Sequence, residues 1–144
     1  MKLVLDASVA GKWLVPETDS DRARWIFERW NRGQIELIAP ALLVAEIASM
    51  LWKRATRGLI STEESIHLFQ EFFKLGLGLT PIETLATVAL ELSILHGHPF
   101  YDCLYVALAI ENRCGLLTAD EKLFHSFHPQ LPQVRLLKSL EIEG

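Results

Sequence analysis

The sequence has only two cysteines, a shortage of basic residues and no long hydrophobic run. Two cysteines in 144 residues are too few for a small disulfide-stapled domain. The 14 lysines and arginines are outnumbered by 18 acidic residues, for a formal net charge of −4. This balance excludes a strongly basic nucleic-acid binder, but not a nucleic-acid enzyme with an acidic pocket. No apolar stretch approaches the roughly 18 residues of a membrane helix, so we expect no membrane association.

What the sequence does contain is typical of one folded globular domain. Half of the residues are hydrophobic and 22% are charged, which predicts a single domain over residues 1–144. We expect both cysteines, Cys103 and Cys114, to lie in one helix. At about 1.5 Å of rise per residue they would be roughly 16 Å apart, too far for a disulfide bond. We therefore expect two free thiols in a protein of the reducing cytoplasm.

Apolar runs that suit strands alternate with segments of helical periodicity. Strands are predicted over residues 2–5, 35–39, 77–80, 116–118 and 134–137. Helices are predicted over about 19–32, 41–57, 62–75, 81–97, 99–113 and 120–127, with a capping box at Ser61. Strands separated by helical crossovers predict an α/β fold with a mostly parallel sheet covered on both faces.

Four acidic residues occur where apolar residues or turns would be expected. Asp6 ends the first predicted strand, Asp120 follows the fourth, and Asp102 opens a long apolar helix. Glu46 interrupts another apolar helix, so it must either face solvent or be buried with a partner. Because ligands of open parallel sheets bind at the carboxyl ends of the strands, we expect Asp6 and Asp120 at that edge.

Each of these acids also has a purely structural explanation. Asp6 and Asp120 could cap the helices that follow them, and Asp102 could complement a helix dipole. Thr118 and Glu121 also fit a capping box. As a group, however, four acids with no basic residue beside them would repel one another unless cations filled the site. Hard oxygen ligands favour Mg²⁺ or Mn²⁺, so the residues predict an acidic, metal-binding pocket.

At these positions the sequence resembles the PIN-domain ribonucleases, specifically the VapC-type toxins of toxin–antitoxin pairs. The matching segments are residues 3–8, 40–46, 101–109 and 117–123, and the resemblance runs from residue 2 to about residue 137. It implies a three-layer α/β/α sandwich with four to five strands, and cleavage of RNA that depends on Mg²⁺ or Mn²⁺. The implied catalytic and metal-binding acids are Asp6, Glu46, Asp102 and Asp120, with supporting hydroxyls from Ser8 and Thr118.

The resemblance also implies partners. A small VapB-like antitoxin would bind near the active site, and the paired helices over 41–75 would serve a homodimer and contact substrate or antitoxin. Lys53 and Arg57 fall close to the helical face of Glu46, and with Arg54 they could hold RNA phosphates. The same three bases could instead only complement the end of their helix.

Three other functions are consistent with the same sequence. They are a non-catalytic PIN-like module that binds RNA or protein, another Mg²⁺-dependent phosphohydrolase, and a signalling receiver domain. Phosphatases with a nucleophilic Asp typically carry a second Asp two residues later, where this chain has Ser8. A receiver domain needs an adjacent acidic pair near the first strand, which is not found in this chain.

Histidines and tryptophans are expected to be structural. His96 and His98 flank a glycine at a predicted helix end, which suits a loop better than a metal site. Aromatic residues at helical spacing are mostly core residues, and any exposed one would suit an antitoxin groove. The four tryptophans are Trp13, Trp25, Trp30 and Trp52.

Overall fold

A single parallel sheet forms the centre of the structure, a computed structural model that describes residues 1–142. Its five strands have the order β3-β2-β1-β4-β5, and every neighbouring pair is parallel. The strands are β1 (Lys2–Leu5), β2 (Glu36–Pro40), β3 (Gly78–Thr80), β4 (Gly115–Thr118) and β5 (Val134–Leu136). The predicted parallel sheet is confirmed, including its short third strand.

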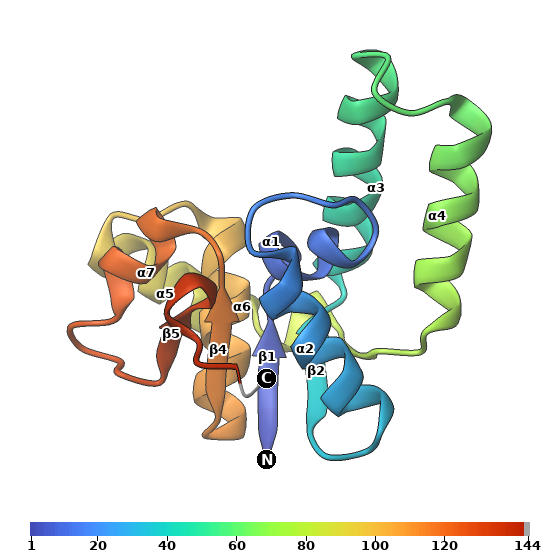
Figure 1. Ribbon diagram of the computed structural model, residues 1–144. Helices are drawn as coiled ribbons and strands as arrows, with labels where there is room; N and C mark the ends of the chain where they lie inside the picture. The colour runs from blue at the N-terminus through green and yellow to red at the C-terminus, as the bar shows by residue number, and fades with distance from the viewer. Residues whose placement is uncertain (143–144) are drawn as a thin grey trace.

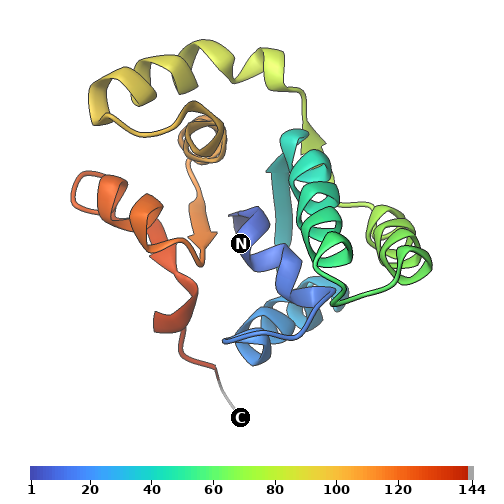
Figure 2. The same ribbon diagram turned by 90° about the horizontal axis from the view of Figure 1, so that it is seen from above.

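Helices cover both faces of this sheet (Figure 1). They are α1 (Ala7–Ala10), α2 (Ser20–Asn31), α3 (Leu42–Thr56), α4 (Thr62–Lys74), α5 (Ala86–His96), α6 (Phe100–Asn112) and α7 (Glu121–Phe127). Seen from above, α1 and α2 lie on one side of the sheet and α5 and α6 on the other (Figure 2). The fold is therefore the expected three-layer α/β/α sandwich.

The middle of the hydrophobic core lies between β1 and α6. Val4 and Leu5 are fully buried, as expected for a central parallel strand that is covered on both faces. α6 packs across β1, β2 and β4 and is covered on its outer side by α5, so residues 103–109 are buried without interruption. This packing fixes the position of every side chain that α6 presents at the carboxyl edge of the sheet.

α3 and α4 form a helix pair that extends beyond the carboxyl ends of the strands (Figure 1). The capping box at the start of α4 is confirmed in part, since the Ser61 hydroxyl accepts a hydrogen bond from the backbone N–H of Glu64 at 3.0 Å. No further layer of the described residues covers this pair. Trp52 on α3 is 62% exposed and Ile66 on α4 is 53% exposed.

Three details differ from the sequence-based expectation. Trp52 is not a core residue, whereas the other three tryptophans pack against the core. The helix predicted from residue 81 begins as a 3₁₀ turn over Ile82–Thr84, and α5 starts only at Ala86. Cys114 lies beyond α6, because Arg113 adopts a positive φ of 50° that ends the helix. Both cysteines are free, as predicted.

Among the described residues, no helix is both long enough and apolar enough to cross a bilayer.

Candidate active site

The four predicted acids all lie near the carboxyl edge of the sheet. Asp6 directly follows β1, and Asp120 follows β4 after a single residue. Asp102 occupies the first turn of α6, and Glu46 lies in the second turn of α3. Asp6 is the most deeply buried of them at 6% exposure, whereas the side chain of Asp102 is 27% exposed.

Burial and mutual repulsion raise the pKa values of two of these acids. Burial is the main cause of the raised pKa of Asp6, and the charges of Asp102 and Asp120 add to it. Burial also raises the pKa of Glu46 to about 7, again with contributions from the charges of Asp6 and Asp102. The four side chains thus share one electrostatic environment, and we call them the acid cluster. A divalent cation would relieve the repulsion within such a cluster.

Two hydroxyls hold Asp6 in place. Ser8 Oγ and Thr118 Oγ1 both donate to Asp6 Oδ2, at 2.5 Å and 2.8 Å. The Ser8 hydroxyl in turn accepts from the backbone N–H of Ala119 at 2.8 Å, and that of Thr118 accepts from the N–H of Asp120 at 3.0 Å. These bonds tie the end of β1 to the end of β4, so two acids of the cluster have a fixed relative position.

Glu46 is held by Tyr105, which is not among the predicted site residues. The Tyr105 hydroxyl donates to Glu46 Oε1 at 2.6 Å. Tyr105 is fully buried, and burial together with the nearby acid charges raises the pKa of its phenol far above the usual range. The phenol is therefore a permanent donor. Tyr105 lies three positions after Asp102, one helical turn away, which is the signal that could have identified it.

Asp102 is held by an imidazole. Its Oδ2 lies 2.8 Å from Nε2 of His98, a residue that is 7% exposed. His98 lies in the loop between α5 and α6, as expected. The expectation that no basic residue stands beside the acids is wrong, because this loop turns the imidazole back over the first turn of α6.

Asp120 caps α7. Its Oδ1 accepts hydrogen bonds from two backbone N–H groups in the first turn of that helix, at 2.9 Å and 3.3 Å. The alternative capping box is wrong, since Glu121 pairs with Lys138 and does not reach back to Thr118. Asp6, in contrast, makes no side-chain capping bond to α1. Capping therefore explains part of the role of Asp120 and none of the role of Asp6.

Each acid of the cluster uses one oxygen within the protein. The engaged atoms are Oδ2 of Asp6, Oε1 of Glu46, Oδ2 of Asp102 and Oδ1 of Asp120. Within residues 1–142 no fully buried side-chain oxygen or nitrogen lacks a partner, so the second oxygen of each acid, which makes no hydrogen bond within the protein, is not completely shielded from solvent. Each acid thus keeps one carboxylate oxygen for a ligand, and carboxylate oxygens are the ligands that Mg²⁺ and Mn²⁺ prefer.

This donor set is open and does not form a closed cage. In the part of the chain that the structure describes, no group of three or more His, Cys, Asp or Glu side chains is placed so that it could hold a metal ion together. Mg²⁺ commonly keeps several waters and is bound directly by only one or two carboxylates. The acid cluster fits that mode of binding, with water completing the coordination.

A groove leads from the acid cluster along α3. It has a volume of about 510 Å³ and is lined by Glu46 at one end and by Lys53, Arg54 and Arg57 farther along the helix. Lys53 and Arg57 are exposed, whereas Arg54 forms an ion pair with Glu17 at 3.1 Å. The groove therefore joins the acids to a stretch of positive charge.

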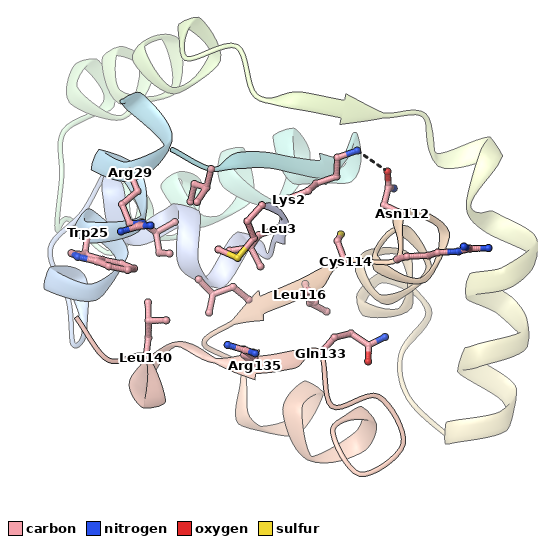
Figure 3. A pocket seen from close by; sticks show the side chains of 16 residues that line it. Lys2, Leu3, Trp25, Arg29, Asn112, Cys114, Leu116, Gln133, Arg135 and Leu140 are labelled. Carbon is pink, nitrogen blue, oxygen red and sulfur yellow. Dashed lines mark hydrogen bonds between the residues drawn. The ribbon is translucent and has the colours of Figure 1, made fainter. Parts of the chain in front are cut away.

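A second cavity lies at the opposite edge of the sheet, where β1 and β4 begin (Figure 3). Its volume is about 570 Å³, and Trp25, Arg29 and Arg135 line it together with apolar residues of the strands. Among residues 1–142, no acidic side chain lines this cavity. It is consequently not a candidate for the metal site.

The chain is similar to known proteins in sequence and in fold. Residues 3–127 match the PIN domain family. This chain belongs to the PIN domain family. The chain is 38% identical over 130 residues to Ribonuclease VapC3 of Pyrobaculum aerophilum, a match that covers 88% of this chain and 95% of that protein. The predicted VapC-type membership is thereby confirmed.

A solved structure supports the same fold. The crystal structure of PAE2754 from Pyrobaculum aerophilum matches the PIN domain with a TM-score of 0.63 and 19% sequence identity. The match covers 88% of this chain and 79% of that one. At this level of identity the likeness concerns the fold alone.

Proposed function

We propose that this PIN domain is a metal-dependent endoribonuclease and the toxin of a toxin–antitoxin pair. The observation that carries the proposal is the acid cluster, in which each carboxylate is hydrogen-bonded through one oxygen and has no protein partner at the other. Similarity to Ribonuclease VapC3 over most of the chain supports the same class of activity.

In this proposal the open oxygens of the acid cluster hold Mg²⁺ or Mn²⁺. Held by these acids, such a cation would supply an activated water and would stabilise the leaving oxygen of the phosphodiester. The chain's own residues orient the acids. Ser8 and Thr118 orient Asp6, Tyr105 orients Glu46, and the α7 amides orient Asp120. Pre-set orientation lowers the cost of assembling the site around substrate.

The groove along α3 would carry the RNA backbone. Lys53 and Arg57 are exposed in this groove and would neutralise phosphates on one side of the scissile bond. Arg54 would add a third positive charge, with Glu17 fixing its position. Phosphate contacts of this kind position RNA without reading its sequence.

The exposed face of the α3–α4 pair would bind a VapB-like antitoxin. A groove of about 440 Å³ lies between the two helices and is lined by Trp52, Ile66 and Phe69 among others. Large aromatic side chains of this kind are typical anchors of protein interfaces. The same helix pair would contribute to a homodimer. Two free thiols suit the reducing cytoplasm, where we place the protein.

Two alternatives are less consistent with the geometry. In a non-catalytic binding module, the acids would need no fixed orientation, yet Tyr105 and His98 are buried donors directed at Glu46 and Asp102. In a phosphohydrolase with a nucleophilic Asp, a second acid would stand two residues after Asp6. Here that position is Ser8, and its hydroxyl is engaged in holding Asp6.

Metal-dependent RNA cleavage tests the proposal. Wild-type protein and Asp102→Asn would each be incubated with total transfer RNA, ribosomal RNA and a messenger transcript, with Mn²⁺ or with EDTA. We expect the wild type to cleave at least one of these RNAs with Mn²⁺ only, and the variant to cleave none. RNA binding by both proteins without metal-dependent cleavage would support the non-catalytic module instead.

A further inference from the structure

His98 is a buried imidazole with both ring nitrogens engaged. Nε2 lies 2.8 Å from Asp102 Oδ2, and Nδ1 lies 2.9 Å from the Ser126 hydroxyl on α7. The ring also meets the Phe127 ring edge to face, with centroids 5.5 Å apart. Its backbone is fixed as well, because the Ser93 hydroxyl donates to the His98 carbonyl oxygen at 2.5 Å. A polar ring held from so many sides has little freedom to rotate.

The partners of the ring define the direction of its hydrogen bonds. An ionised Asp102 can only accept, so Nε2 of His98 carries the proton that is shared with it. In the neutral imidazole Nδ1 then accepts from the Ser126 hydroxyl. The bonds form a chain that runs from Ser126 on α7 through His98 to Asp102 on α6. Ser126 lies near the C-terminal end of α7, and Asp120 caps the N-terminal end of the same helix.

We propose that His98 is a positioning residue of the acid cluster, which fixes Oδ2 of Asp102 and leaves Oδ1 free to bind a divalent cation. This inference rests on the proposed function. Asp102 needs such support, because its side chain is 27% exposed at a helix start and its orienting bond comes from His98. By bonding to Ser126, the imidazole also links the helix that carries Asp102 to the helix capped by Asp120.

A purely structural role makes different predictions. If His98 only tied the α5–α6 loop to α7, its loss would lower stability and leave the cation affinity of the folded protein unchanged. Groups that orient metal ligands typically change metal affinity by about 10-fold to 100-fold when they are removed. Affinity for Mn²⁺ in the folded protein therefore separates the two roles.

The experiment compares His98→Leu, which removes the donor, with His98→Gln, which retains a side-chain N–H. His96→Leu is the matched control, since His96 packs on the same Phe127 ring at 4.5 Å but has no hydrogen bond to an acid among the described residues. Mn²⁺ would be titrated calorimetrically into each protein, and urea unfolding of the metal-free proteins would report stability. We expect His98→Leu to weaken Mn²⁺ binding by about 10-fold or more, His98→Gln to restore most of it, and the control to bind like wild type.

The outcomes distinguish this inference from the proposed function. If the wild type binds Mn²⁺, Asp102→Asn does not, and His98→Leu binds like wild type, the role of His98 is overturned while the metal site stands. If the wild type and Asp102→Asn bind alike, the proposed function itself fails. Should His98→Leu not fold, Ser126→Ala decides, because it keeps the buried ring and removes only its second partner. Unchanged Mn²⁺ affinity in Ser126→Ala would then overturn the inference.

Discussion

The hydroxyl of Tyr105 on α6 lies 2.6 Å from Oε1 of Glu46 on α3 and joins the two helices that carry acids of the cluster. The other three acids are held in the same manner, by the hydroxyls of Ser8 and Thr118, by an imidazole, or by backbone N–H groups. None of these donors is a lysine or an arginine. Hydroxyl and backbone N–H donors orient a carboxylate without neutralising it, so the negative charge stays available to a cation.

Tyr105→Phe tests this relationship directly. Loss of the hydroxyl frees the Glu46 carboxylate to rotate, and we expect Mn²⁺ affinity and RNA cleavage to fall by about 10-fold. The free energy of unfolding should fall by only about 1 kcal/mol, the usual contribution of one hydrogen bond. Tyr101→Phe is the control, because Tyr101 lies on the same helix but is 63% exposed. Equal Mn²⁺ binding by both variants would show that Glu46 needs no orientation by Tyr105.

Asp102→Asn should separate activity from stability. The substitution keeps the size of the side chain but removes one charge from the acid cluster, so we expect RNA cleavage to be abolished. The metal-free variant should be as stable as the wild type or more stable, since repulsion with Asp6 and Glu46 is reduced. Gel assays of RNA cleavage and urea unfolding measure the two effects. Full metal-dependent activity in this variant would contradict the assignment of Asp102.

Metal-free protein should lose stability as the pH rises through the mildly acidic range. A carboxyl whose pKa is raised on folding binds its proton more tightly in the folded state, so its contribution is greatest below the ordinary pKa. For Glu46 the contribution is complete below its ordinary pKa of 4.5 and is lost as the pH climbs to about 7. The pKa of Asp6 is shifted in the same direction.

Urea unfolding at a series of pH values with EDTA measures this effect. We expect the midpoint to decline with rising pH in the wild type and to decline less in Glu46→Gln. Saturating Mn²⁺ should abolish most of the decline, because the cation stabilises the ionised carboxylates of the folded state. A midpoint that rises over this range in the metal-free wild type would contradict the convergence of the acids.

Lys53→Gln and Arg57→Gln should weaken RNA binding without altering the metal site. Each phosphate contact with a single strand contributes about 0.7 to the slope of log affinity against log salt. We expect each substitution to lower that slope by about this amount when binding is measured in the Asp102→Asn background. Lys74→Gln is the control, since Lys74 is exposed on α4 and pairs with Glu71. An unchanged slope in both groove variants would mean that RNA does not follow α3.

The sequence was enough to predict the parallel sheet and to place Asp6 and Asp120 at its carboxyl edge, but it did not indicate Tyr105 and His98, which bond to two of the acids. Short apolar runs between caps and glycines mark buried parallel strands, and an acid at the end of such a run stands out. Tyr105 does not stand out, because a buried tyrosine within an apolar helix looks like any other core residue. In the sequence His98 looks like an ordinary loop residue, and only the folded structure shows its ring hydrogen-bonded to Asp102.

Surface features were the least predictable. Trp52 has the helical spacing of a core residue, and only the absence of a further layer over the α3–α4 pair leaves it exposed. The pairing of Glu121 with Lys138 likewise depends on how the chain returns after β5, 17 positions later. Local sequence patterns therefore predict neither the exposure of Trp52 nor the pairing of Glu121 with Lys138.

Calorimetric titration of Mn²⁺ into metal-free wild type, Asp102→Asn and Glu63→Gln tests the central claim most directly, because it requires no knowledge of the RNA. Glu63 is an exposed acid at the start of α4 and controls for the loss of one charge. The account predicts saturable binding by the wild type and by Glu63→Gln, and binding at least about 10-fold weaker by Asp102→Asn. No binding by the wild type, or equal binding by all three proteins, would contradict a cation site built from these four acids.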